Sequence, residues 1–282
     1  MIKDTGGVRI PKEDWDNLII LDGCRYDIFK NTYPSFEYLN GELSKKVSLG
    51  SGSPEFLTRN FSDRKYSDIV YTTSNPFVMK ILNKSFHYTE HVWLEGWDEE
   101  HQTVLPQTMV EYSLRMLDNY PNKKHVFHFM QPHHPFIGKT RIKNDHGFVG
   151  AIAKSTDEEV PDVRLVWERL RAGELSVDEV WKAYEDNLRF VLKEIEEFVL
   201  SLEGKTIITS DHGNAFGERA KPFPTRVFGH GDRIRIPALV DVPWFEMNSR
   251  TRRDIRSGPT HNEANEQDIK NIEKKLEMLG YK

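Results

Sequence analysis

Two short apolar runs, each followed by an aspartate, constrain the fold of this chain most strongly. Residues 18–21 read LIIL and lead into Asp22, and residues 206–210 read TIITS and lead into Asp211. Uninterrupted runs of this length, rich in β-branched residues, are typical of strands that are buried on both faces. Helical patterns alternate with such runs along the chain. The sequence therefore predicts an α/β fold, a three-layer sandwich with a mainly parallel central sheet.

Weaker patterns predict the remaining elements. Three further strands are expected at residues 68–73, 125–130 and 234–242. Helices are expected at residues 103–119, 161–171, 176–202 and 265–279, where apolar residues recur every three or four positions. The helix at 176–202 begins with a capping box formed by Ser176 and Glu179, and Gly204 ends it. We expect one domain over residues 1–282, with a core at about 16–245 and a C-terminal helix at 265–279.

Composition excludes several classes of function. The 282 residues include 39 Lys and Arg against 44 Asp and Glu, a net charge of −5, so the chain lacks the global positive field of a nucleic-acid binder. The single cysteine, Cys24, excludes a disulfide framework and a cysteine-rich zinc site. No apolar run approaches the roughly 18 residues of a membrane span. We expect a cytoplasmic protein with no membrane span.

Carboxylates and imidazoles cluster near the predicted strand ends. Because parallel strands end at the same edge of a sheet, Asp22 and Asp211 are expected to converge, with His212 beside them. Further histidines lie in the segments HFMQPHHP and GHG, namely His128, His133, His134 and His230. Taken singly, each of these residues is most simply explained by a structural role. Together, Asp22, Asp211 and His212 predict a site for a divalent cation such as Zn²⁺ or Mn²⁺.

The segment SLGSGSPEFL at residues 48–57 predicts the start of a helix. Ser53 is placed as the N-cap, Pro54 at the first helical position and Glu55 in the first turn, which fully explains the pattern in structural terms. The same geometry places a hydroxyl where a helix N-terminus stabilises an anion, as a nucleophile that attacks an ester requires. Ser53 would need activation by the predicted metal. Ser48 and Ser51 are alternative nucleophiles.

Five segments together resemble a known family. NLIILDGCRYDIF, GSGSPEFL, FMQPHHPFIG, TIITSDHGNAFGE and FGHG…IPALVDVPW resemble sulfatase-like members of the alkaline phosphatase superfamily, over most of residues 16–245. The resemblance implies that Asp22, Asp211 and His212 bind one metal ion. It implies that Ser53 is the nucleophile and completes the metal shell. It also implies that His230 contacts the transferred group or a second, weaker metal.

Departures from the family pattern restrict which nucleophile and which metal ion are expected. Ser53 is not followed by the x-Pro-x-Arg of sulfatases that use formylglycine, and Cys24 lies beside the first strand, which argues against formylglycine. Asp211-His212 replaces the Asp-Asn typical of calcium sulfatases, so Zn²⁺ or Mn²⁺ is favoured over Ca²⁺. No aspartate has a histidine four residues later, which favours one metal over two.

These features predict a metal-dependent hydrolase or transferase that acts on phosphate esters through a serine nucleophile. His230, with His134 or His133, is expected to hold the non-bridging oxygens or to protonate the leaving group. Substrate binding is assigned to His133, Arg25 and Arg226, and the substrate to an anionic small molecule or glycan-linked phosphate ester. Loops at 138–162 and 219–228 are expected to set specificity. The alternatives are a sulfate ester hydrolase without formylglycine and a non-catalytic, degenerate protein that binds a metal or an anion.

Overall fold

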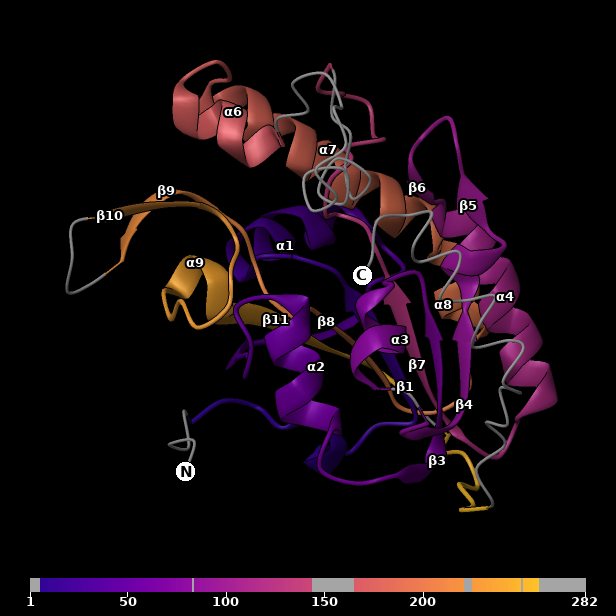
Figure 1. Cartoon of the computed structure of the whole chain (residues 1–282). Helices are drawn as coiled ribbons and strands as arrows, with labels where there is room; N and C mark the ends of the chain where they lie inside the picture. The colour runs from indigo at the N-terminus through magenta and orange to yellow at the C-terminus, as the bar shows by residue number, and fades with distance from the viewer. Residues whose placement is uncertain (1–5, 83, 144–164, 221–224, 250, 259–282) are drawn as a thin grey trace.

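The computed structural model describes residues 6–82, 84–143, 165–220, 225–249 and 251–258 (Figure 1). A sheet of seven strands forms its centre, in the order β2-β11-β8-β1-β7-β3-β4. The bounds are β1 Asn17–Leu21, β2 Gly41–Val47, β3 Tyr66–Thr73, β4 Phe86–His91, β7 Lys124–Phe129, β8 Thr206–Thr209 and β11 Asp241–Met247. Strands β8, β1, β7, β3 and β4 are parallel, and β11 runs antiparallel to both β8 and β2. The predicted α/β fold with a mainly parallel sheet is confirmed.

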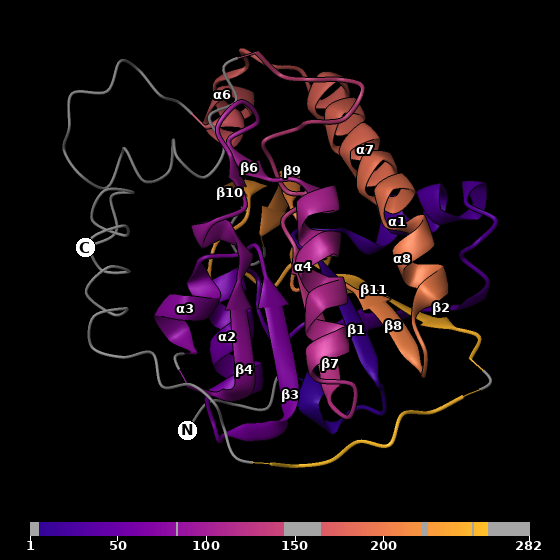
Figure 2. The same cartoon turned by 90° about the vertical axis from the view of Figure 1, so that its right-hand side faces the viewer.

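Helices cover both faces of this sheet, as Figure 2 shows. Along β1, Ile19 and Leu21 belong to one apolar cluster and Leu18 and Ile20 to another, because successive side chains of a strand point to opposite faces. The first cluster is covered by α1 (Tyr26–Thr32), α4 (Pro106–Asn119), α7 (Val177–Glu194) and α8 (Glu196–Ser201). The second is covered by α2 (Ser53–Phe61) and α3 (Phe77–Ile81). The molecule is thus a three-layer sandwich.

Smaller elements surround the sheet. They are α6 (Val166–Ala172), α9 (Pro237–Val240), the hairpin β9 (Ala215–Ala220) with β10 (Thr225–Gly229), the pair β5 (Trp97–Asp98) and β6 (Thr103–Val104), and 3₁₀ turns at Ile10–Lys12, Tyr33–Ser35 and Val92–Leu94. Helix α6 and the hairpin lie beyond the carboxyl ends of the parallel strands (Figures 1 and 2). None of the helices in the described part of the chain is long and apolar enough to cross a membrane.

Most of the predicted elements that fall on described residues are confirmed. The strands at 18–21, 68–73, 125–130 and 206–210 correspond to β1, β3, β7 and β8. The helix at 103–119 corresponds to α4, which begins at Pro106, and the described part of the helix at 161–171 corresponds to α6. The helix at 176–202 is interrupted at Ile195 and forms α7 and α8. Ser176 caps α7 by accepting a hydrogen bond from the Glu179 amide at 3.2 Å. The predicted C-terminal helix at 265–279 lies outside the described residues.

Two predicted elements are wrong. The strand expected at 234–242 is divided into α9 and β11, because Pro237 occupies the first turn of a short helix and pairing with β8 and β2 begins only further along the chain. The loop expected at 219–228 contributes instead to the β9-β10 hairpin, whose ladder pairs Arg226 with Arg219. Arg219 and Arg226 are exposed, and the stretch shows no alternation of apolar and polar residues from which a strand is predicted. The loop expected at 138–162 is described only up to residue 143, without regular structure.

The second core cluster contains an aromatic group whose centre is fully buried Phe61. Its ring lies 5.4–6.2 Å, centroid to centroid, from the rings of Phe56, Tyr66, Tyr71 and Phe86. We expect Phe61→Ala to lower the free energy of unfolding by about 3–5 kcal/mol, because it removes a buried ring and leaves a cavity. Urea titration followed by circular dichroism measures the loss.

The matched control for Phe61→Ala is Leu200→Ala. Leu200 is 62% exposed near the end of α8, so its truncation is expected to change the free energy of unfolding by less than about 0.5 kcal/mol. Equal effects of the two substitutions would contradict the assignment of Phe61 to the core.

Candidate metal centre

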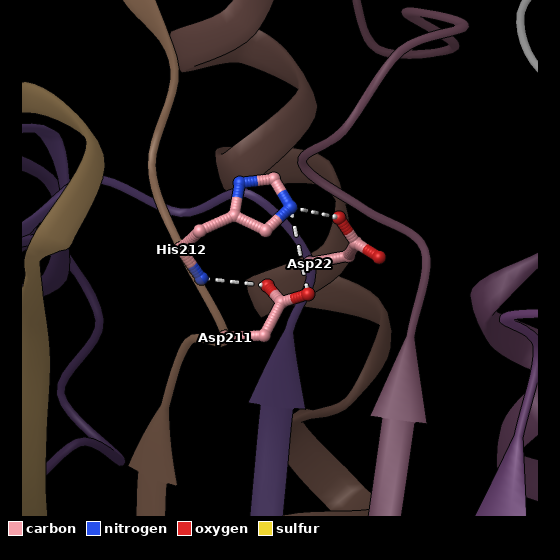
Figure 3. Close-up of side chains that lie close together, drawn as sticks. All are labelled: Asp22, Asp211 and His212. Atoms are coloured by element: carbon pink, nitrogen blue, oxygen red, sulfur yellow. Dashed lines mark hydrogen bonds and ion pairs between the residues drawn. The ribbon is translucent and has the colours of Figure 1, made fainter. Parts of the chain in front are cut away.

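The two aspartates that follow β1 and β8 converge with His212 (Figure 3). One ligand atom from each of Asp22, Asp211 and His212 can be chosen so that all three atoms lie within 4.8 Å of one another. Strands β1 and β8 are neighbours in the sheet, with Ile20 paired to Thr209, so the residues beyond their carboxyl ends meet. All three side chains are at most 2% exposed.

Backbone amides orient the Asp211 carboxylate. Its Oδ1 accepts hydrogen bonds from the amides of Gly23 at 3.0 Å and His212 at 2.9 Å. Gly23 has a φ of +66°, a left-handed conformation that glycine adopts without strain, and this turn directs its amide at the carboxylate. With Oδ1 held in this way, Oδ2 faces His212 Nε2 at 3.5 Å.

The orientation of the His212 ring places an unprotonated nitrogen towards the carboxylates. Nδ1 lies 2.9 Å from the carbonyl oxygen of Gly213, which can only accept, so Nδ1 carries the proton. In the neutral ring, Nε2 then presents a lone pair, at 3.5 Å from both Asp22 Oδ1 and Asp211 Oδ2. A positive charge at Nε2, either a proton or a metal ion, would be stabilised by the two carboxylate oxygens that face it in this buried site.

The donor set fits a divalent cation. Asp22 Oδ1 is buried and has no hydrogen-bond partner, so this oxygen is left for a cation. The three ligand atoms include two separations of 3.5 Å, close to the roughly 3.3 Å between ligands of a tetrahedral zinc ion with bonds of about 2.0–2.1 Å. Carboxylate oxygen and imidazole nitrogen are ligands that suit Zn²⁺ and Mn²⁺.

The pKa values of Asp22 and His212 are shifted by the charges of the side chains around them. Burial acts to raise the pKa of Asp22, but the neighbouring histidines, His128 first among them, outweigh it and lower the pKa below its usual value. Burial acts to lower the pKa of His212, and the charges of Asp211 and Asp22 outweigh it, so this pKa is raised. The two carboxylates therefore favour a cation at this position.

Ser53 lies beside the same three side chains. It is the first residue of α2, whose N-cap is Gly52, and its side chain makes no capping hydrogen bond. The predicted N-cap is thus wrong by one residue: the Ser53 hydroxyl donates to Asp211 Oδ2 at 2.7 Å and accepts no hydrogen bond from a helix amide. Its Oγ also lies 3.3 Å from Asp22 Oδ2 and 3.4 Å from His212 Nε2.

The two alternative serines make structural contacts. The Ser48 hydroxyl donates to the carbonyl oxygen of Asp211. The Ser51 Oγ lies 2.8 Å from the carbonyl oxygen of Gly231 and accepts a hydrogen bond from the Ile234 amide at 3.0 Å. Of the three serines, Ser53 is the one whose hydroxyl contacts the carboxylates of the cluster.

Two further polar residues at the cluster were not assigned a role from the sequence. Asn75 lies just beyond β3, and its Nδ2 donates to Asp22 Oδ2 at 2.7 Å and to Ser53 Oγ at 3.1 Å. His128, in β7, places Nε2 3.5 Å from Asp22 Oδ2, and its Nδ1 is 3.0 Å from the hydroxyl of Tyr71. The signal in the sequence that could have identified Asn75 is its position as a polar residue just after a predicted strand.

Three histidines lie next to the cluster. His133 Nε2 is 3.0 Å from His230 Nε2, and the His133 ring stacks on His134 at 4.5 Å. The His230 ring lies 4.3 Å from that of His212. Burial, followed by the neighbouring His134, lowers the pKa of His133 to about 4, and burial likewise lowers the pKa of His230. Both rings are enclosed by protein, which is the physical cause of the two lowered pKa values.

The two arginines predicted to bind substrate lie elsewhere. The buried Arg25 guanidinium forms ion pairs with Asp27 at 2.7 Å and with Glu218 at 2.6 Å, so its charge is already compensated. Arg226 is exposed on β10, opposite Arg219. Neither Arg25 nor Arg226 lines the cavity at the cluster. The structure does not bring them together with Asp22 and Ser53.

A cavity of about 330 Å³ opens above Ser53. Its polar floor consists of Asp22, Ser53, Asn75, His133, His134 and His230. Its outer wall consists of Phe77, Met130, Leu165, Trp167, Glu168 and Phe228. Among the described residues, a single group of three or more histidine, cysteine or acidic side chains has metal-binding spacing, so a second metal at His230 stays a prediction.

Comparison with known proteins identifies the fold. Neither a family model nor a curated protein matches the chain. Among solved structures, the integral membrane protein lipooligosaccharide phosphoethanolamine transferase A from Neisseria meningitidis is similar, with a TM-score of 0.56 and 13% identity. The match covers 86% of this chain and 49% of the transferase, so the chain spans about half the length of that protein. The chain has a sulfatase-like fold.

Two further structures agree with this assignment. The soluble domain of the same transferase matches with a TM-score of 0.55 and 13% identity, over 86% of this chain and 79% of the domain. A Bacteroides thetaiotaomicron protein assigned as a sulfatase matches with a TM-score of 0.52 and 12% identity, over 94% of this chain and 70% of its own. The fold implied by the sequence motifs is confirmed.

Proposed function

We propose that this sulfatase-like protein is a metal-dependent hydrolase or transferase of phosphate esters, with Ser53 as the nucleophile. One observation carries the proposal: the Ser53 hydroxyl lies at the floor of a cavity and contacts Asp211, Asp22 and His212. The fold shared with a phosphoethanolamine transferase and with a protein assigned as a sulfatase supports an ester of phosphate or sulfate as substrate. We favour a small-molecule or glycan-linked phosphate ester.

Asp22, Asp211 and His212 would hold the metal ion, with Ser53 as a further ligand. When bound, a divalent ion such as Zn²⁺ or Mn²⁺ supplies the positive charge that favours the ionised hydroxyl of a neighbouring serine. The unpartnered Asp22 Oδ1 and the free lone pair of His212 Nε2 support this ligand set. Asn75 holds the nucleophile in place through its hydrogen bond to Ser53 Oγ.

The reaction would proceed by in-line attack of Ser53 Oγ on phosphorus. The bond from Oγ to phosphorus forms while the bond to the leaving alkoxide breaks, and the product is a phosphoserine. Without a metal ion, the Ser53 hydroxyl donates to Asp211 Oδ2 at 2.7 Å. Since Oδ2 would hold the ion, the hydroxyl proton would pass to water in the open cavity, and the leaving alkoxide would take up a proton from water. Water, or an acceptor hydroxyl, then attacks phosphorus from the side opposite Ser53 and releases the serine.

Neutral histidines would serve the phosphoryl group as hydrogen-bond donors. Since burial keeps the pKa of His133 and His230 low, both rings are uncharged at neutral pH before substrate binds. The proton of His133 is on Nδ1, which lies 2.7 Å from the carbonyl oxygen of His134, so His133 Nε2 accepts a hydrogen bond from His230 Nε2 at 3.0 Å before substrate binds. On substrate binding, the His230 N–H would turn from His133 to a non-bridging oxygen, which gains charge in the transition state, and His134, which lines the same cavity, would donate a second hydrogen bond.

Rates on one alcohol esterified with phosphate or with sulfate test the proposal. The metal-loaded protein is expected to turn over the phosphate ester faster, because the ligand set departs from that of formylglycine sulfatases. A large preference for sulfate would reverse the assignment to phosphate. Absence of turnover on phosphate monoesters and diesters, with one metal ion bound per chain, would favour a non-catalytic binding protein.

A further inference from the structure

His128 is a buried imidazole beside the candidate metal centre to which the proposed reaction gives no role. It lies in β7 and pairs with Ile20 of β1 and Thr73 of β3, close to the carboxyl ends of both strands. The side chain is fully buried. Its Nε2 lies 3.5 Å from Asp22 Oδ2 and 3.8 Å from Asp211 Oδ2. Depending on the tautomer, this nitrogen either offers a lone pair to a metal ion or donates its proton towards the carboxylates.

The hydroxyl of Tyr71 decides the tautomer of His128. Tyr71 is fully buried in the second core cluster, where its ring lies 5.8 Å from that of Phe61 and 4.8 Å from that of Phe86, centroid to centroid. Among the described residues, the one hydrogen-bond partner of this hydroxyl is His128 Nδ1, at 3.0 Å. If the hydroxyl accepted from Nδ1, its own proton would be left without an acceptor in the core, which costs free energy. Tyr71 therefore donates to Nδ1, and the ring proton of His128 is on Nε2.

The N–H of His128 faces one of the two oxygens of the Asp22 carboxylate. Asp22 Oδ2 already accepts from Asn75 Nδ2 at 2.7 Å, and the His128 N–H approaches this same oxygen. The separation of 3.5 Å exceeds the roughly 2.7–3.2 Å of a usual hydrogen bond, so the attraction is electrostatic. Asp22 Oδ1 has no hydrogen-bond partner in the described part of the chain and lies 3.5 Å from His212 Nε2. Two donors that face Oδ2 thus hold the carboxylate with Oδ1 directed at His212.

The spacing of the cluster agrees with a donor role for His128. Among the described residues, the group with metal-binding spacing consists of Asp22, Asp211 and His212 and does not include His128. A proton on Nε2 also prevents this nitrogen from binding a metal ion, which needs the lone pair. Hydrogen-bond donors behind a ligating carboxylate orient it, and loss of such a donor lowers metal affinity about 10–100-fold.

We propose that Tyr71 and His128 are positioning residues of the metal centre. The Tyr71 hydroxyl fixes the proton of His128 on Nε2, and this N–H holds Asp22 Oδ2, so that Oδ1 is presented to the metal ion. His128 is then not itself a ligand. The inference rests on the proposed function for the presence of a metal ion at this site. It adds the residues that orient one of the ligands from behind.

NMR measures the tautomer directly and without turnover. Long-range proton–nitrogen correlation spectra of protein with isotope-labelled histidine distinguish a protonated ring nitrogen from one with a lone pair. Comparison with His128→Gln identifies the signals of His128. In the zinc-loaded protein, we expect a proton on Nε2 and none on Nδ1. A proton on Nδ1 would overturn the inference, whether or not Nε2 also carries one.

Zinc affinity tests the positioning role. His128→Leu combined with Tyr71→Phe removes both polar partners, so neither is left buried without the other. This double variant should fold, and its affinity for Zn²⁺ should fall about 10–100-fold, as measured by competition with a chelating dye. His128→Gln offers an oxygen that accepts from Tyr71 and an amide N–H that faces Asp22, so its affinity should stay within about fivefold of the wild type. Wild-type affinity in the double variant, or the same loss in His128→Gln, would overturn the inference.

His125→Leu is the matched control. His125 is also fully buried in β7, but it lies near the other end of the strand, and its Nε2 is 3.0 Å from the carbonyl oxygen of Tyr120. Its replacement should leave zinc affinity within about twofold of the wild type. A loss as large as that of the double variant would show a general effect of buried histidines in this strand and would contradict a specific role for His128.

The positioning role and the proposed catalysis fail separately. The expected tautomer and affinities, observed in a protein that turns over no ester, would support the positioning role and refute the catalysis. Ester turnover with a proton on His128 Nδ1 would do the reverse. A wild-type protein that binds no Zn²⁺ would overturn the positioning role, whereas turnover with Mn²⁺ would still support the proposed function.

Discussion

Ser53→Ala is expected to lower kcat on a phosphate ester by about 10⁴-fold or more, because it removes the atom that attacks phosphorus. Metal content should stay near that of the wild type, since Asp22, Asp211 and His212 remain. The Ser53 side chain does not cap α2, so loss of its hydrogen bonds should cost only about 1 kcal/mol of stability. Steady-state kinetics, metal analysis and thermal unfolding of the purified variant measure the three quantities.

Ser51→Ala is the control for this prediction. Ser51 lies two residues away and bonds to Gly231 and Ile234, so its loss should affect the loop around these residues more than catalysis. If Ser51→Ala abolishes turnover while Ser53→Ala does not, the nucleophile is misassigned. If neither substitution changes the rate, the covalent route is wrong. A phosphorylated peptide containing residue 53, recovered after rapid acid quenching, would be direct evidence for a covalent phosphoserine intermediate.

The sequence allowed the centre of the sheet to be predicted because burial there is unambiguous. Strand β1 lies between β8 and β7 and is buried at all five positions; its first residue, Asn17, is hydrogen-bonded to Thr206, and the four that follow are apolar. Strand β2 was missed because it lies at the edge of the sheet, pairs only with β11 and carries the exposed or half-buried residues GELSKKV. Backbone hydrogen bonds to β11 hold this strand in the sheet, and they require no alternation of side chains from which a strand could be predicted.

A residue of the candidate site was predicted correctly when the end of its own strand fixes its position. A residue was missed, or given a wrong role, when its contact is with a partner far away in the chain. Asp22 and Asp211 follow adjacent parallel strands, so their strand positions alone bring them together. Asn75 has two functions: its Oδ1 accepts from the Phe77 amide in a local turn, while its Nδ2 reaches Asp22. From the sequence, only the local turn at Asn75 can be recognised, and not its contact with Asp22. Arg25 was assigned to substrate because its partner Glu218 is 193 residues away in the chain.

Asp211→Asn is expected to reduce metal content from about one ion per chain to a small fraction of that. The substitution keeps the shape of the side chain, and one oxygen can still accept from the amides of Gly23 and His212. The amide nitrogen then replaces Oδ2, so a donor instead of a lone pair faces His212 Nε2. Affinity should fall by more than the roughly 10–100-fold that follows loss of a residue that only supports a ligand.

Asp241→Asn is the matched control, because Asp241 pairs with half-exposed Lys45 away from the cluster and should retain the metal. Added Zn²⁺ or Mn²⁺ should raise the thermal midpoint of the wild type and of Asp241→Asn, since a ligand that binds only the folded state stabilises it, and should not raise that of Asp211→Asn. Equal metal content in Asp211→Asn and the wild type would exclude Asp211 as a ligand. A wild-type protein that binds neither ion would exclude the metal centre itself, and with it the activation of Ser53 proposed above.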